Sequence, residues 1–72
     1  MIDVKIKGIY RHFKGGEYKV LEIARNSNDP KKLMVIYETL YHGEYPIGTV
    51  WVRPLDEFTG YKDGVPRFEL LE

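Results

Sequence analysis

The 72-residue chain contains no cysteine. Disulfides and zinc sites with thiolate ligands are therefore excluded. A chain this short buries only about 60% of its unfolded surface, so it needs another source of stability. One tryptophan, six tyrosines and three phenylalanines favour dense ring packing. The zero net charge leaves association open, so we expect a monomer or a homodimer.

The sequence also lacks any apolar run near the roughly 18 residues that cross a bilayer. Its first residues alternate apolar and polar side chains, unlike the unbroken apolar centre of a signal peptide. Together with the missing cysteine, this predicts a soluble, cytoplasmic protein with no membrane partner. Eleven basic and eleven acidic residues give no basic excess, which argues against strong non-specific nucleic-acid binding.

Alternating hydrophobicity predicts strands over residues 9–13, 17–25 and 49–54, and a last strand is expected near residues 68–70. The β-branched and aromatic run over 33–41 predicts the longest strand. Gly15 and Gly16 predict a tight hairpin turn in which both take positive φ. Apolar residues on both faces of 17–25 predict a bent central strand, with Val20 and Ala24 on one face and Ile23 on the other.

The remaining segments predict loops and one helical turn. "NSNDPKKL" (26–33) predicts a loop in which Asp29 caps a short helical turn. "PLDEFTG" (54–60) predicts a single helical turn with Leu55 and Phe58 on one face, and Asp63-Gly64 predicts another turn. Residues 1–7 fit either an extra strand or an ordered arm. We therefore expect one all-β domain over 1–72, a small SH3-like barrel of five to six short strands with one helical turn before the last strand.

Four segments together resemble a known family. They are "YRHFKGGEYKVLEIARNS", "VIYETLY", "WVRPLDEF" and "PRFELL". Their order and spacing resemble the small bacterial proteins catalogued as domain of unknown function 1653. The resemblance runs from about Gly8 to Leu71 and implies no activity. The segment "HGEYPIG" looks longer than the usual connection at that point.

The first candidate site is the cluster Tyr10, Arg11, His12 and Lys14. Basic residues beside aromatic ones hold phosphates and stack bases. The plainer interpretation is a hairpin that points its charges outward, and it is favoured because charged strand faces are ordinary. His12 fits equally well as a buried, hydrogen-bonded side chain.

The second candidate site contains Tyr41, Trp51 and Arg53. Tyr41, Tyr45 and Trp51 are suited to an aromatic groove for an extended peptide, and Arg53 to pairing with a carboxylate or phosphate. The competing interpretation makes Trp51 a packing residue and Arg53 an ion-pair partner of Asp56 or Glu57.

Enzymatic chemistry has little support in this sequence. Ser27 is the single serine and lies outside any nucleophile elbow. His12 and His42 have no metal-motif spacing, so no metal site and no cofactor are predicted.

We therefore expect a non-enzymatic binding or adaptor module. Its expected partner is a protein or peptide, because net neutrality and aromatic content suit such an interface. RNA or single-stranded DNA is the alternative and requires the basic residues to cluster on one face. An enzyme acting on a small anionic ligand is the third interpretation. The expected contact residues are Tyr10, Arg11, His12, Lys14, Tyr41, Trp51 and Arg53.

Overall fold

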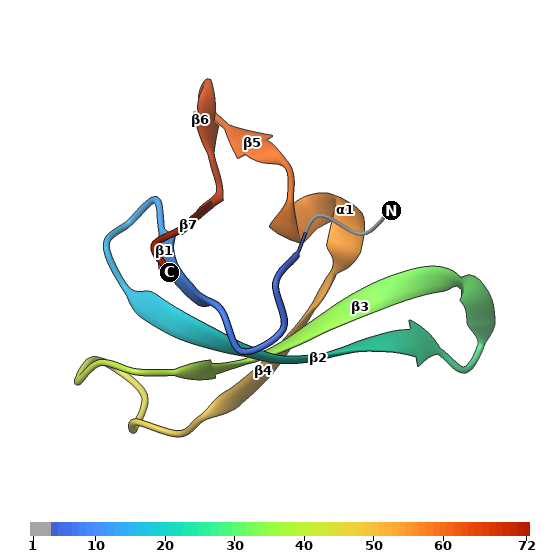
Figure 1. Ribbon diagram of the computed structural model, residues 1–72, viewed down its shortest axis with the longest axis horizontal. Helices are drawn as coiled ribbons and strands as arrows, with labels where there is room; N and C mark the ends of the chain where they lie inside the picture. The colour runs from blue at the N-terminus through green and yellow to red at the C-terminus, as the bar shows by residue number, and fades with distance from the viewer. Residues whose placement is uncertain (1–3) are drawn as a thin grey trace.

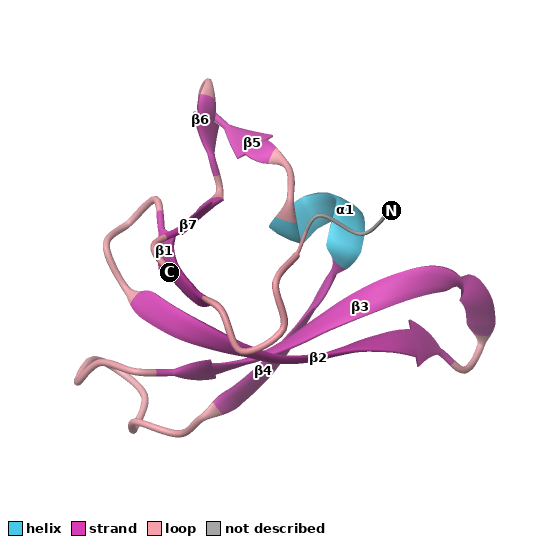
Figure 2. Ribbon diagram, viewed as in Figure 1, coloured by secondary structure: helices cyan, strands magenta, loops and turns pink. Residues whose placement is uncertain are grey.

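Residues 4–72 are described by the computed structural model, in which β-branched and aromatic segments form one antiparallel sheet (Figures 1 and 2). Its strands are β1 (Ile9–His12), β2 (Glu17–Asn26), β3 (Asp29–Thr39), β4 (Val50–Pro54) and β7 (Phe68–Leu70), ordered β4-β3-β2-β1-β7. The helix α1 (Leu55–Phe58) follows β4, and β5 (Tyr61–Lys62) pairs with β6 (Val65–Pro66) in a separate hairpin. The all-β fold with one helical turn before the last strand is confirmed.

The sheet is bent in the SH3-like manner, but β4 and β7 do not pair with each other, so the expected barrel is not closed. Side-chain packing joins the two edges instead. Phe58 of α1 is 1% exposed and stacks on Phe68 of β7, with 4.1 Å between ring centroids. The strand count exceeds the expected five to six because β5 and β6, two residues each, flank the predicted Asp63-Gly64 turn.

A β-bulge in β2 corrects the predicted faces of that strand. Val20 pairs with Tyr37, whereas Glu22 pairs with the next residue along, Ile36, so the register shifts at Leu21. The extra residue breaks the side-chain period of two. Val20 and Ile23 therefore share the core face, and the prediction that they lie on opposite faces is wrong. The central position of β2, between β1 and β3, is as predicted.

The predicted loop over 26–33 is much shorter than expected, and its helical turn is absent. β2 continues to Asn26 and β3 begins at Asp29, so only two residues turn the chain. The Asn26 side chain accepts a hydrogen bond from the Asn28 N–H (2.9 Å), and Arg25 donates to the Pro30 carbonyl (2.7 Å). Pro30 is tolerated within the strand because the ladder is irregular between Arg25 and Asn26.

Residues 4–7 form an ordered segment rather than a strand, while residues 1–3 of the predicted arm lie outside the described part of the chain. Val4 is buried in the core. The Lys5 N–H donates to the Tyr10 hydroxyl (2.9 Å), and the Lys7 N–H donates to the Val20 carbonyl (2.7 Å). Of the two interpretations, the ordered arm is the one that fits residues 4–7.

The core depends on rings from α1 and the inner face of the sheet. Phe58 packs edge-on against Tyr10 (5.2 Å) and Tyr37 (5.5 Å), besides its stack on Phe68.

We expect Phe58→Ala to lower the free energy of unfolding by about 3–5 kcal/mol, measured by urea denaturation. Tyr61→Ala, which removes a ring that is 71% exposed, is the control and is expected to cost under about 1 kcal/mol. If Phe58→Ala lowers the free energy of unfolding by no more than the control does, Phe58 is not the central residue of the core.

Candidate functional site: an aromatic cavity at one end of the sheet

A cavity of about 800 Å³ lies at the end of the sheet that carries the β1–β2 and β3–β4 loops. Both loops are at the left of the view, opposite the β2–β3 turn (Figure 1), and Figure 2 shows them as irregular chain. We call it the aromatic cavity, because seven rings line it: His12, Tyr18, Tyr37, Tyr41, Tyr45, Trp51 and Phe68.

Strand register brings these rings together. His12 of β1 pairs with Phe68 of β7, and Tyr37 of β3 pairs with Trp51 of β4. Directly paired residues point to the same face of an antiparallel sheet, so all four rings share the inner face. The predicted alternation in β4 is confirmed, since Trp51 and Arg53 are partly buried whereas Val50 and Val52 are 57% and 58% exposed.

The floor of the aromatic cavity is continuous with the core. Tyr37 and Phe68 are almost buried and lie 5.4 Å apart between ring centroids. At the mouth the rings are accessible, with Tyr41 38% and Tyr45 49% exposed. Tyr45 meets Trp51 edge to face at 4.8 Å. The cavity thus has a fixed floor and an exposed aromatic rim.

A tyrosine pair and a glycine shape one side of the cavity. The hydroxyls of Tyr18 and Tyr41 are hydrogen-bonded at 3.1 Å. Burial first, and the hydrogen bond to Tyr41 second, raise the pKa of Tyr18 above its ordinary value of 10.0. Only Gly15 of the glycine pair has positive φ (107°), which corrects the prediction for Gly16. Gly16 has a different role: a Cβ there would lie 2.5 Å from the Tyr41 ring.

A hydrogen bond between two further side chains holds Trp51 in place. The Trp51 Nε1–H donates to the hydroxyl of Thr39 at 2.8 Å, and Thr39 is 2% exposed. Trp51 therefore combines the two roles left open by the sequence: its ring is partly buried against the core and also lines the cavity.

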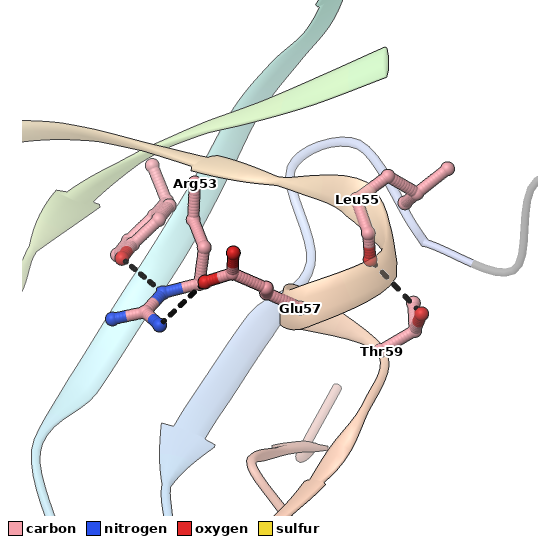
Figure 3. A network of polar contacts seen from close by, with 5 residues as sticks. Arg53, Leu55, Glu57 and Thr59 are labelled. Atoms are coloured by element: carbon pink, nitrogen blue, oxygen red, sulfur yellow. Dashed lines mark hydrogen bonds and ion pairs between the residues drawn. The ribbon is translucent and has the colours of Figure 1, made fainter. Parts of the chain in front are cut away.

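Arg53 has three partners, and Figure 3 shows its two polar contacts. Its Nε–H donates to the Tyr37 hydroxyl at 3.3 Å, and its Nη1 lies 3.6 Å from Oε1 of Glu57. The guanidinium lies 5.8 Å from the centroid of the Phe68 ring. The ion pair is the i, i+4 contact between β4 and α1, so of the two predicted acidic partners Glu57 is the one found.

His12 is in an environment that favours its neutral form. Burial lowers its pKa below the ordinary 6.5, and the positive charges of Arg53, Lys14 and Arg67 lower it further. Its Nδ1 accepts a hydrogen bond from the Lys14 N–H at 3.2 Å. The neutral ring therefore carries its proton on Nε2.

The structure separates the predicted contact residues into three groups. His12, Lys14, Tyr41, Trp51 and Arg53 all line the aromatic cavity. Tyr10 is 5% exposed and lies in the core, so its assignment to a contact surface is corrected: its face of β1 is covered by α1 and residue 4. Arg11 is exposed but does not line the cavity, because it follows Tyr10 on the opposite face of β1 and pairs with Glu69 at 3.6 Å.

Sequence reasoning did not select Tyr18, Tyr37 or Phe68, which complete the cavity wall. Their residue type was visible, but the segment around Tyr37 has no polar face from which its orientation could be predicted. The missing information was the register, which alone brings Tyr37 opposite Trp51 and Phe68 opposite His12.

Comparison with known proteins supplies the family. The family model described as "Protein of unknown function (DUF1653)" matches residues 8–70. The chain belongs to this family. The match confirms the resemblance carried by the sequence segments and attaches no activity to DUF1653. Neither the curated proteins nor the solved structures contain a match.

Two further findings concern residues 4–72 alone. None of their helices is long and apolar enough to cross a bilayer. Within the same range, no cluster of three or more His, Asp or Glu side chains is arranged to hold a metal ion.

We expect the His12 environment to make stability depend on pH. Because the folded state lowers the His12 pKa, its contribution is fully present above 6.5 and is lost as pH falls through the lower folded value. Urea denaturation at about pH 7.5 and about pH 5.5 should show a smaller loss for His12→Gln than for the wild type. His42→Gln, which removes the exposed histidine of the β3–β4 loop, is the control. Equal losses in wild type and His12→Gln would contradict the prediction.

Gly16→Ala tests the wall of the cavity. The added Cβ collides with the Tyr41 ring, a partly exposed side chain that can move aside. We therefore expect a loss of stability of about 1 kcal/mol or less, together with loss of the Tyr18–Tyr41 hydrogen bond. Ring-proton NMR shifts of Tyr41 measure the displacement. Unchanged Tyr41 shifts in a folded variant would show that the ring does not lie over Gly16.

Proposed function

We propose that this DUF1653 chain is a non-enzymatic binding module that receives a segment of a protein partner in the aromatic cavity. One observation carries the proposal: Tyr41 and Tyr45 remain accessible at the rim of a cavity whose floor is already packed. Small domains ordinarily bury large rings in their core. Accessible rings around a cavity are typical of interface centres, where tyrosine, tryptophan and arginine contribute most of the binding energy.

The geometry supports a protein segment better than a nucleic acid. Only part of the predicted basic cluster faces the cavity: Lys14 and Arg53 line it, whereas Arg11 faces away. Two carboxylates, Glu17 and Glu44, also line the cavity and would repel a phosphate backbone. A partner segment with apolar or aromatic side chains can use the rings without that repulsion.

Peptide display on the immobilised protein tests this proposal. We expect selected peptides to lose about 30-fold in affinity for Tyr45→Ala, the change expected when an interface ring worth about 2 kcal/mol is removed. Tyr61→Ala is the matched control, because Tyr61 is an exposed tyrosine outside the cavity. Its affinity should equal that of the wild type, as measured by calorimetry.

Two results would contradict the proposal. Selected peptides that bind Tyr45→Ala as tightly as the wild type would place their site elsewhere. A single-stranded oligonucleotide that shifts the cavity amides when no peptide is selected would favour the nucleic-acid alternative.

A further inference from the structure

The charges around His12 make one part of the aromatic cavity positive. Lys14 and Arg53 line the cavity, and Arg67 lies close enough to act on the same imidazole. The Nε of Arg67 is buried and has no hydrogen-bond partner among residues 4–72. Burial is the largest cause of the lowered His12 pKa, and the three cations lower it further, so they oppose a further positive charge there.

Arg53 presents a donor group that the described residues leave unused. Its Nε is taken by the Tyr37 hydroxyl and its Nη1 faces Glu57. Its Nη2 has no hydrogen bond to any residue in the range 4–72, and Figure 3 shows it directed away from Glu57. Because Tyr37, Glu57 and the Phe68 ring already orient the guanidinium, a ligand that binds Nη2 does not have to immobilise this side chain.

Neighbouring groups also act as donors. Neutral His12 carries its proton on Nε2, since Nδ1 accepts from the Lys14 backbone. Lys14, exposed at the hairpin tip, also lines the cavity, and its ammonium lies 5.8 Å from the centroid of the Phe13 ring. Aromatic cages for quaternary ammonium groups attract a cation through ring faces alone. Here Arg53 and Lys14, which also line the cavity, would repel such a ligand close to His12.

We infer that the partner segment is anchored in the aromatic cavity by a carboxylate that accepts hydrogen bonds from Arg53 Nη2, beside an apolar or aromatic group held by the rings. This inference rests on the proposed function and specifies its ligand. A singly charged carboxylate fits better than a phosphate, because Arg53 offers one unused nitrogen and because Glu17 and Glu44 line the same cavity. Tight phosphate sites use several cationic or bidentate donors.

Three small probes that share a phenyl ring test the charge of the ligand: phenylacetate, phenyl phosphate and benzyltrimethylammonium. Each is titrated into the ¹⁵N-labelled protein while amide shifts are followed by NMR. We expect phenylacetate to shift the amides of Lys14, Tyr18 and Arg53 and to bind more tightly than the other two probes. It should also raise the His12 pKa, because a bound anion stabilises the imidazolium.

Matched variants assign the contact. Arg53→Gln should weaken phenylacetate binding about tenfold or more, the effect of losing one charge-assisted hydrogen bond. Since Arg53 also contacts Tyr37 and Glu57, Lys14→Gln provides a second variant at an exposed position, with an expected loss of about twofold to fivefold. Arg11→Gln removes the same charge outside the cavity and should leave binding unchanged.

The results that overturn the inference are distinct from those that overturn the binding module. If benzyltrimethylammonium or phenyl phosphate binds in the cavity more tightly than phenylacetate, the inference that the ligand carries a carboxylate is wrong. The protein would then still be a binding module, but for a different ligand. Equal losses for Arg11→Gln and Lys14→Gln, or no cavity shifts with phenylacetate, also overturn the inference. Selected peptides that bind Tyr45→Ala as tightly as the wild type would instead contradict the proposed binding function itself.

Discussion

The stack of Phe58 on Phe68 joins the two edges of a sheet that has no hydrogen bonds between β4 and β7. In a chain without cysteine, this ring contact closes the fold where a disulfide or a further strand pairing would otherwise act. α1 has only four residues, so it cannot be stable by itself and is held by what Phe58 buries. The position of β7 relative to β4, and with it the shape of the aromatic cavity, depends on this contact.

The ring packing of the core continues into the aromatic cavity without a boundary. Phe68 stacks on Phe58 and meets His12 edge to face, and Tyr37 contacts both Phe58 and Tyr18. Rings further from α1 are progressively more exposed, up to Tyr41 and Tyr45. One set of aromatic residues thus serves two purposes: the inner members stabilise the fold, and the outer members form a surface on which an apolar group can bind. Arg53 adjoins both the core and the cavity, because its guanidinium lies near Phe68 and the residue also lines the cavity.

The sequence predicted the strands of the main sheet, the α1 turn and five of the cavity residues, because alternation and residue type depend on local chemistry. The prediction of strand faces was wrong where one extra residue shifts the register of β2. The bulge at Leu21 reverses the face of Ile23, and nothing local marks that residue as the extra one. Alternation along β1 places Arg11 on the face opposite Tyr10 and His12. It could not show that the core extends as far as Tyr10 and ends before His12, because that depends on where α1 packs.

The central claim is that the rim rings of the aromatic cavity are available to a ligand and are not required for folding. The most direct measurement is the free energy of unfolding of the Tyr41→Ala/Tyr45→Ala double variant relative to the wild type. Both rings are over a third exposed and make edge contacts, so the account predicts a loss of about 2 kcal/mol or less. A loss as large as the roughly 3–5 kcal/mol expected for one buried aromatic residue would contradict it and make these rings part of the core.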